Sequence, residues 1–123
     1  MNVRGKRILI FGDSLARGAG TYNDSRITSQ DVNRAAPSFG SLFASHLLAR
    51  GASYVWLNSR VGRSATSVFS TESGASLLSQ LGAHKPDIVF VVLGTNDIGL
   101  SAATDKSYMM AIATAFRQTG AEV

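Results

Sequence analysis

The feature that most constrains the fold of this chain is an uninterrupted apolar run in its last third. Asp87 to Leu93 reads DIVFVVL and is apolar at every position from Ile88 onward. A strand with one face in water alternates apolar and polar side chains, whereas a strand covered on both faces does not. The run therefore predicts a strand of a parallel sheet that carries helices on both faces. Such a sheet requires crossover helices between its strands.

Two further apolar runs predict the other strands of this sheet. Arg7 to Phe11 (RILIF) is stopped by Gly12 and Asp13. Ser53 to Asn58 (SYVWLN) is followed by a turn at residues 62–64. Both runs are short, rich in β-branched or aromatic residues and bounded by turn residues, as is typical of buried strands.

Three helices are predicted between and after these strands. Pro37 fits the first turn of a helix that runs to about Arg50, and a second helix covers about residues 71–81. A third helix is expected to begin at a cap supplied by Thr104 or Asp105. The apolar faces that we expect to be buried are Phe39, Leu42, Phe43 and Leu47 in the first helix, and Tyr108, Met109, Ile112, Ala113 and Phe116 in the third.

The alternation of strand and helix predicts a parallel α/β sheet with right-handed crossovers. The chain has 123 residues, which is enough for one hydrophobic core, so we expect residues 1–123 to belong to a single domain. Residues 121–123 stand where a fourth strand is expected to begin. Since three strands cannot give every strand two neighbours, we expect the domain to be incomplete on its C-terminal side.

Composition excludes several classes of function. Hydrophobic residues make up 45% of the chain, which is too apolar for disorder, and no apolar run is long enough to span a membrane. The absence of cysteine excludes disulfides, thiolate zinc sites and cysteine nucleophiles. The net charge is +4, but the basic residues are scattered, so no nucleic-acid partner is expected. The apolar run behind the N-terminal basic residues is too short for a secretory leader, which favours a cytoplasmic or an already processed chain.

A polar, glycine-containing block follows each predicted strand. The three blocks are Gly12–Leu15 (GDSL), Asn58–Gly62 (NSRVG) and Gly94–Asp97 (GTND). Ligands of open parallel sheets bind outside the carboxyl ends of the strands, where these blocks are expected to meet. A serine in a first helical turn presents its hydroxyl beside free backbone N–H groups, and an asparagine adds side-chain N–H donors. Such donors suit a developing oxyanion.

In the order and spacing of these three blocks, the chain resembles the SGNH hydrolases, also called GDSL esterases and lipases. The resemblance implies a flavodoxin-like three-layer α/β/α sandwich with strand order 2-1-3-4-5. It also implies hydrolysis of esters or thioesters through an acyl-enzyme. By resemblance, Ser14 is the nucleophile, and the N–H of Ser14, the N–H of Gly62 and the side chain of Asn96 form the oxyanion hole. The resemblance implies small-molecule, lipid or carbohydrate esters as substrates. No cluster of histidines and carboxylates in the sequence indicates a metal site, and no cofactor is expected.

One part of the family pattern is missing from the chain. The family's general base is a histidine in a C-terminal Asp-x-x-His block, and no such block is present. His84 precedes the third predicted strand and is separated from the end of that strand by more than about 20 Å, at roughly 3.3 Å per residue. His46 falls among apolar side chains, as a partly buried packing residue. We expect a longer chain or a second polypeptide to supply the histidine. The alternative is a catalytically silent module that binds a carbohydrate or an acyl group.

Charged residues beside the blocks are further candidates for the site. Asp13 is expected to position the turn before Ser14 and to border the substrate, and Asp97 is expected to be structural. Arg60 and Arg63 are candidate substrate-binding residues, which would favour an anionic or polyhydroxylated substrate. The alternative is that these arginines simply lie in loops. The long polar loop over residues 21–36 is expected to border the crevice.

Overall fold

The structure, a computed structural model, describes residues 1–17 and 39–123. It contains a parallel sheet of β1 (Arg7–Gly12), β2 (Tyr54–Ser59) and β3 (Ile88–Val92) in the order β2-β1-β3. This order matches the first three strands of the flavodoxin-like arrangement and confirms the predicted fold class. The loop predicted over residues 21–36 and the helix start predicted at Pro37 lie outside the described residues.

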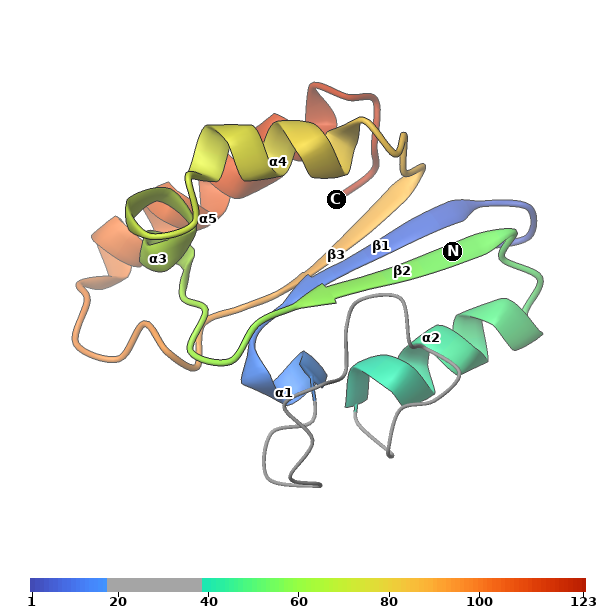
Figure 1. The fold of residues 1–123 in the computed structure, drawn as a ribbon, viewed down its shortest axis with the longest axis horizontal. Helices are drawn as coiled ribbons and strands as arrows, with labels where there is room; N and C mark the ends of the chain where they lie inside the picture. The colour runs from blue at the N-terminus through green and yellow to red at the C-terminus, as the bar shows by residue number, and fades with distance from the viewer. Residues whose placement is uncertain (18–38) are drawn as a thin grey trace.

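Helices cover both faces of the sheet (Figure 1). On one face lie α1 (Ser14–Arg17) and α2 (Phe39–Ala49). On the other face lie α3 (Ala65–Ser70), α4 (Gly74–Gly82) and α5 (Ala102–Arg117). The sheet therefore forms the middle layer of three, as a strand that is apolar on both faces requires.

The central strand β1 divides the apolar core into two clusters. Ile8 and Ile10 pack with residues of the α2 layer, whereas Leu9 and Phe11 pack with residues of the α4 and α5 layer. Successive side chains of a strand point to opposite faces, so an unbroken apolar run serves both layers at once. All four side chains are at most 1% exposed.

The apolar face predicted for α2 is wrong in part. Phe39 and Leu42 were expected to be buried, but they are 53% and 60% exposed. The physical reason is a close approach: a Cβ atom on Gly40 would clash with the carbonyl oxygen of Ala16 in α1. Large side chains do not fit at this contact. The side of α2 that is buried carries small residues and one leucine: Gly40, Ser41, Ala44 and Leu47.

Between β2 and β3 the structure has two helices where one was predicted. Ser64 caps α3, which the sequence analysis missed: its Oγ accepts from the Ser67 N–H at 2.9 Å, and the Ser67 Oγ accepts from the Ser64 N–H at 2.9 Å. This capping box uses serine at its last position, where glutamate or glutamine is the usual signal. The break before α4 is at Ser73, which has a left-handed backbone with φ of 57°.

The helix α5 begins earlier than predicted. Ser101, not Thr104 or Asp105, is the N-cap, and its Oγ accepts from the Thr104 N–H at 3.2 Å. The predicted apolar face is confirmed in its centre, because Ile112 and Phe116 are fully buried. Phe116 contacts Phe11 of β1 edge to face, with 5.7 Å between ring centroids.

The last residues pair with the outer edge of β3. Glu122 forms an isolated parallel bridge with Ile88. Its N–H donates to the Asp87 carbonyl at 2.9 Å, and its carbonyl accepts from the Val89 N–H at 2.7 Å. Strand pairing was expected at this position, and the structure shows it at Glu122.

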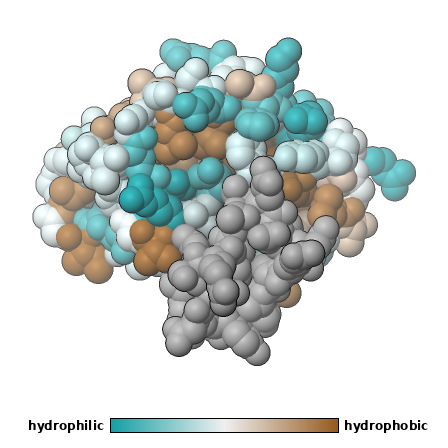
Figure 2. All heavy atoms as spheres, viewed as in Figure 1, coloured by the Kyte–Doolittle hydropathy of each residue, from teal (hydrophilic) through white to brown (hydrophobic). Residues whose placement is uncertain are grey.

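The surface along the β2 edge combines apolar and polar side chains. Figure 2 shows hydrophobic atoms between α4 and β2, bordered by hydrophilic ones. A cavity of about 10 Å³, the size of one water molecule, is lined there by Tyr54, Trp56, Leu81 and His84 among others. Among the residues that the structure describes, no helix has the length and apolar character needed to cross a membrane.

Candidate active site

The three polar blocks lie at the carboxyl ends of the strands, which together form one edge of the sheet. Gly12, the last residue of β1, is in register with Ser59 of β2 and with Val92 of β3, so the three strands end together. Ser14, Gly62 and Asn96 follow these ends after two, three and four residues. The parallel topology therefore carries all three predicted site residues to the same edge.

The first block is shaped by the buried Asp13. Its Oδ1 accepts from the Leu15 N–H at 2.8 Å, and its own N–H donates to the Val92 carbonyl at 3.2 Å. These bonds fix the turn in which half-buried Ser14 begins α1. Asp13 is only 1% exposed, in keeping with its role in the turn, and its contact with a substrate stays a prediction.

Gly12 is required at its position because the chain leaves no space for a side chain. A Cβ atom there would lie 2.5 Å from the Ala16 Cβ and 3.3 Å from the Val92 carbonyl oxygen. Any larger residue would move α1 away from the sheet. Since α1 begins with Ser14, the glycine fixes where the serine stands relative to β3.

The second block presents Gly62 in an exposed turn. Gly62 has a φ of 76°, in the left-handed region that glycine adopts readily. The Arg63 N–H donates to the Arg60 carbonyl at 3.2 Å, which closes the turn around Gly62. The Arg60 N–H donates to the Gly12 carbonyl at 3.2 Å and so joins the turn to the end of β1.

The third block directs Asn96 toward the second. The Asn96 Nδ2 donates to the Arg63 carbonyl at 2.9 Å, and the amide nitrogen carries a second N–H for another acceptor. The neighbouring Asp97 is buried, and its Oδ2 accepts from the Ala65 N–H at 3.0 Å, at the start of α3. Asp97 therefore holds α3, in agreement with the structural role predicted for it.

Most of the sequence also matches a known protein family, in agreement with this arrangement. Residues 10–123 match the GDSL-like lipase/acylhydrolase family. The chain belongs to this family. No curated protein sequence shows a significant match to it.

Several solved structures share the fold of this GDSL-like chain. The crystal structure of TesA is 25% identical, with a TM-score of 0.64 over 94% of this chain and 57% of TesA. AlinE4, an SGNH-hydrolase family esterase, is 21% identical, with a TM-score of 0.64 over 94% of this chain and 55% of AlinE4. The psychrotrophic esterase EstA from Pseudoalteromonas sp. is 20% identical, with a TM-score of 0.63 over 94% and 56%. The chain thus spans a little over half the length of these proteins.

The two arginines of this GDSL-like site differ in their surroundings. Arg63 is 4% exposed, and its Nε and Nη2 donate to the two carboxylate oxygens of Glu72 at 2.9 and 2.8 Å. Its Nη1 donates to the carbonyls of Gly12 at 3.1 Å and Asn58 at 3.0 Å. The Arg63 guanidinium is therefore buried and engaged within the protein, and contact of this residue with a substrate stays a prediction. Arg60 has a side chain that is 53% exposed, 3.5 Å from Glu72, and stays a candidate.

Glu72 is the residue of this region that the sequence analysis missed. Burial of its carboxylate acts to raise its pKa, but the hydrogen bonds and charge of Arg63, together with the charge of Arg60, outweigh burial and hold the pKa below its ordinary value. The carboxylate is therefore ionised at neutral pH. The only sequence signal was a glutamate nine residues after an arginine, and this spacing brings the two together only when α3 lies between them.

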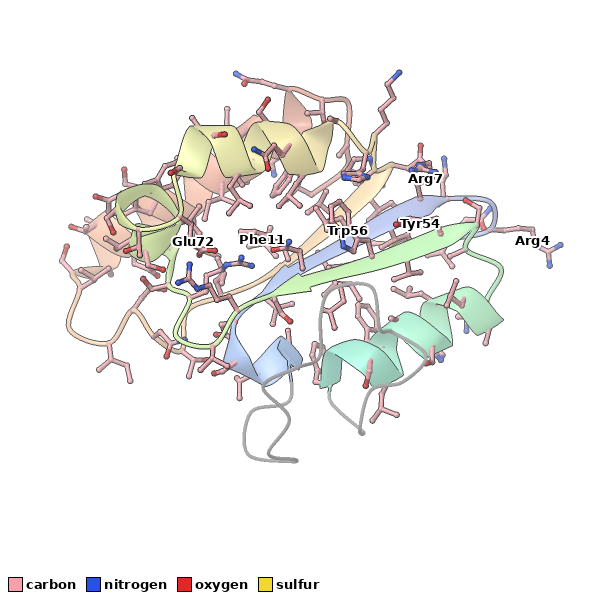
Figure 3. The ribbon with its side chains drawn as sticks, in the orientation of Figure 1. Arg4, Arg7, Phe11, Tyr54, Trp56 and Glu72 are labelled. Carbon is pink, nitrogen blue, oxygen red and sulfur yellow. The ribbon has the colours of Figure 1, made fainter. Side chains whose placement is uncertain are left out.

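The histidines of the GDSL-like chain lie elsewhere. The His84 ring packs against Trp56 with 4.0 Å between ring centroids, and the His84 carbonyl accepts from the Arg7 Nη2 at 2.9 Å. Figure 3 shows Arg7 and Tyr54 at the end of the sheet away from Glu72, where His84 was predicted. His46 is exposed on α2, so its predicted packing role is wrong. In the part of the chain that the structure describes, neither histidine bonds to Ser14.

Proposed function

We propose that this GDSL-like chain carries the nucleophile and the oxyanion hole of a serine hydrolase acting on carboxylic esters or thioesters. The observation that carries the proposal is the meeting of Ser14, Gly62 and Asn96 at one strand-end edge, with the Asn96 amide already held by the Arg63 carbonyl. Membership of the family supports the reaction class.

In the proposed mechanism, the Ser14 Oγ attacks the acyl carbon of the substrate. The oxyanion of the tetrahedral intermediate accepts from the N–H groups of Ser14 and Gly62 and from the second N–H of the Asn96 amide. Collapse of the intermediate expels the alcohol or thiol and leaves an acyl-enzyme, which water then hydrolyses. The Ser14 proton needs an acceptor, and we propose a histidine outside these 123 residues, on the same or on a second polypeptide.

The second candidate function is binding without catalysis. It is favoured by the positions of His46 and His84, neither of which bonds to Ser14 among the described residues. A serine without a base is a poor nucleophile, so such a module would hold an acyl or carbohydrate ligand in the same crevice.

Hydrolysis of p-nitrophenyl acetate separates the two candidates. In the presence of imidazole, we expect Ser14→Ala to lower the rate by at least about tenfold, whereas Ser107→Ala, on the exposed side of α5, leaves it unchanged. Added imidazole can take the place of the missing base, so the difference between wild type and Ser14→Ala is expected to grow with imidazole concentration. Equal rates in wild type and Ser14→Ala at every imidazole concentration would remove the enzyme proposal and leave the binding one.

The exposed Arg60 is proposed to favour substrates that are anionic or rich in hydroxyl groups. Arg60 lies in the turn two residues before Gly62, and its side chain is 53% exposed. We expect Arg60→Gln to lower the ratio of rates between an anionic and a neutral ester, and Arg4→Gln, at the opposite end of the sheet, to leave the ratio unchanged (Figure 3). An unchanged ratio in Arg60→Gln contradicts this role.

A further inference from the structure

We propose that the Arg63–Glu72 ion pair is the positioning element of the oxyanion hole: it holds the backbone that presents Gly62 and fixes the Asn96 amide. This inference rests on the proposed function for the roles of Gly62 and Asn96. Arg63 and Glu72 themselves are positioning residues, because both are buried beneath the edge rather than exposed to a substrate.

The first step of the argument is that the Arg63 side chain connects two strands. Its Nη1 donates to the last carbonyl of β1, at Gly12, and to the Asn58 carbonyl in β2. Its Cζ lies 4.3 Å from the centroid of the Phe11 ring, so the guanidinium also packs on the core. Figure 3 shows Phe11 and Glu72 near each other at this end of the sheet. The guanidinium thereby links the carboxyl ends of β1 and β2.

The second step is that the Arg63 backbone contacts two of the three proposed oxyanion donors. Arg63 directly follows Gly62, and its N–H closes the turn onto the Arg60 carbonyl. Its carbonyl accepts the Asn96 Nδ2 at 2.9 Å. A displacement of this one residue therefore moves both the Gly62 N–H and the Asn96 amide.

The third step is that Glu72 closes a ring of contacts around the site. Its carboxylate takes two donors of the Arg63 guanidinium, and its N–H donates to the Ser67 carbonyl of α3 at 3.1 Å. The first residue of α3 donates in turn to Asp97, the neighbour of Asn96. The ring runs from Asn96 through Arg63, Glu72 and α3 back to Asp97. The third block is thus held at two residues, Asn96 and Asp97.

The chemistry of the pair explains the residue types. A guanidinium offers donors in a planar fork that matches a carboxylate, while a further nitrogen reaches the two carbonyls. A lysine in its place would supply a single charged nitrogen, which cannot bind Glu72 and both carbonyls in the same geometry. Arg63→Lys therefore keeps the charge of residue 63 but loses the planar arrangement of its N–H donors.

The test compares Arg63→Lys and Glu72→Gln with Arg7→Lys. Arg7 is the matched control, because its guanidinium also donates twice to one carbonyl, that of His84, but at the other end of the sheet. The rate is the Ser14-dependent hydrolysis of p-nitrophenyl acetate with imidazole, at a temperature at which circular dichroism shows each variant to be folded. We expect kcat to fall about tenfold to a hundredfold in Arg63→Lys and Glu72→Gln, with KM within about threefold of wild type, and neither to change in Arg7→Lys.

A second readout does not depend on turnover. In ¹H–¹⁵N spectra of the folded proteins, we expect the Asn96 side-chain amide and the Gly62 N–H to shift in Arg63→Lys and to stay in place in Arg7→Lys. If wild type and Ser14→Ala hydrolyse the ester equally, the proposed function fails, and these resonances alone decide the positioning role. Unmoved resonances, a kcat within about twofold of wild type, or a change in KM alone would overturn the inference.

A milder substitution covers the case in which the first variants do not fold. Glu72→Asp keeps the negative charge and shortens the side chain by one methylene, so the fork contact with Arg63 lengthens while the charges stay paired. We expect an intermediate loss of kcat and a smaller shift of the Asn96 amide. A folded Glu72→Asp protein with wild-type kcat and wild-type resonances would contradict the positioning role as directly as the stronger variants.

Discussion

At the scale of single residues, Arg63 and Arg60 show how burial decides the use of a side chain. Both arginines belong to the turn after β2 and both approach Glu72, at 2.8 and 3.5 Å. Arg63 is buried and makes hydrogen bonds with all three guanidinium nitrogens, whereas the Arg60 side chain is half exposed. Residue type alone could not separate them. The first serves the architecture of the site, and the second, although it also pairs with Glu72, keeps half of its side chain exposed to solvent.

The buried pair leads to a prediction for stability. Glu72→Gln leaves the Arg63 guanidinium buried without its counter-charge, and breaking a buried pair in this way costs about 3 kcal/mol. We therefore expect the free energy of unfolding in urea at pH 7 to fall by about that amount. As a control, Gln80→Ala on the exposed face of α4 is expected to cost less than about 1 kcal/mol. A loss in Glu72→Gln no larger than that of the control contradicts the prediction.

The same carboxylate predicts a pH dependence of stability. The pKa of Glu72 is lowered in the folded chain from its ordinary value of 4.5. A group with a depressed folded pKa contributes its full stabilisation above the unfolded value and loses it as the pH falls through the folded value. We expect the difference in unfolding free energy between wild type and Glu72→Gln to be constant from pH 7 to about pH 5.5 and to shrink below 4.5. Denaturation series at several pH values measure it, and a difference that grows in acid would refute the assignment.

At the scale of elements, local sequence predicts the strands well and the helix contacts less well. RILIF and IVFVV indicate strands by themselves because they are short, apolar and bounded by turn residues. The buried face of α2 was misjudged because the count of large apolar residues favoured Phe39 and Leu42, whereas the contact with Ala16 selects the smallest residue, Gly40. Such a selection depends on a neighbour that is distant in the chain.

This correction can be tested with two substitutions in α2. Gly40→Ala places a Cβ against the Ala16 carbonyl oxygen, which is backbone and cannot rotate away. We expect it to lower the free energy of unfolding by about 1 to 3 kcal/mol, although alanine is the better helix former. Leu42→Ala removes a larger but exposed side chain and is expected to cost less than about 1 kcal/mol. Chemical denaturation ranks the two, and the opposite ranking would restore the face predicted from hydrophobicity.

At the scale of the whole molecule, the parallel sheet and the three strand-end blocks were predictable, and the connections within the site were not. Each block follows a strand that its own residues indicate, so the topology brings Ser14, Gly62 and Asn96 together without further information. The Arg63–Glu72 contact depends on α3, whose only local signal is a serine capping box, and on the break at Ser73. Because the sequence analysis missed α3 and the break at Ser73, it could not predict the Arg63–Glu72 contact.

The strand order predicts how protection from hydrogen exchange is distributed. β1 has a strand on each side, and its residues 8–11 are at most 1% exposed, whereas β2 has a single neighbour in the described sheet. We expect the amides of β1 to exchange only through global unfolding and those on the free edge of β2 to exchange by local opening, at least about a hundredfold faster. Native-state hydrogen exchange followed by NMR measures both, and equal protection of β1 and β2 would contradict the order β2-β1-β3.

The narrow space around Ala16 has a consequence for how these sequences can vary. The side chain of Ala16 occupies the volume that a Cβ on Gly12 would need, and its carbonyl blocks a Cβ on Gly40. A methyl group at residue 12 is therefore expected to be tolerated only when residue 16 becomes glycine, and such compensated pairs should recur together among homologues. The glycine of the G-D-S-L block is then held by a constraint of volume that it shares with Ala16, a residue outside the block.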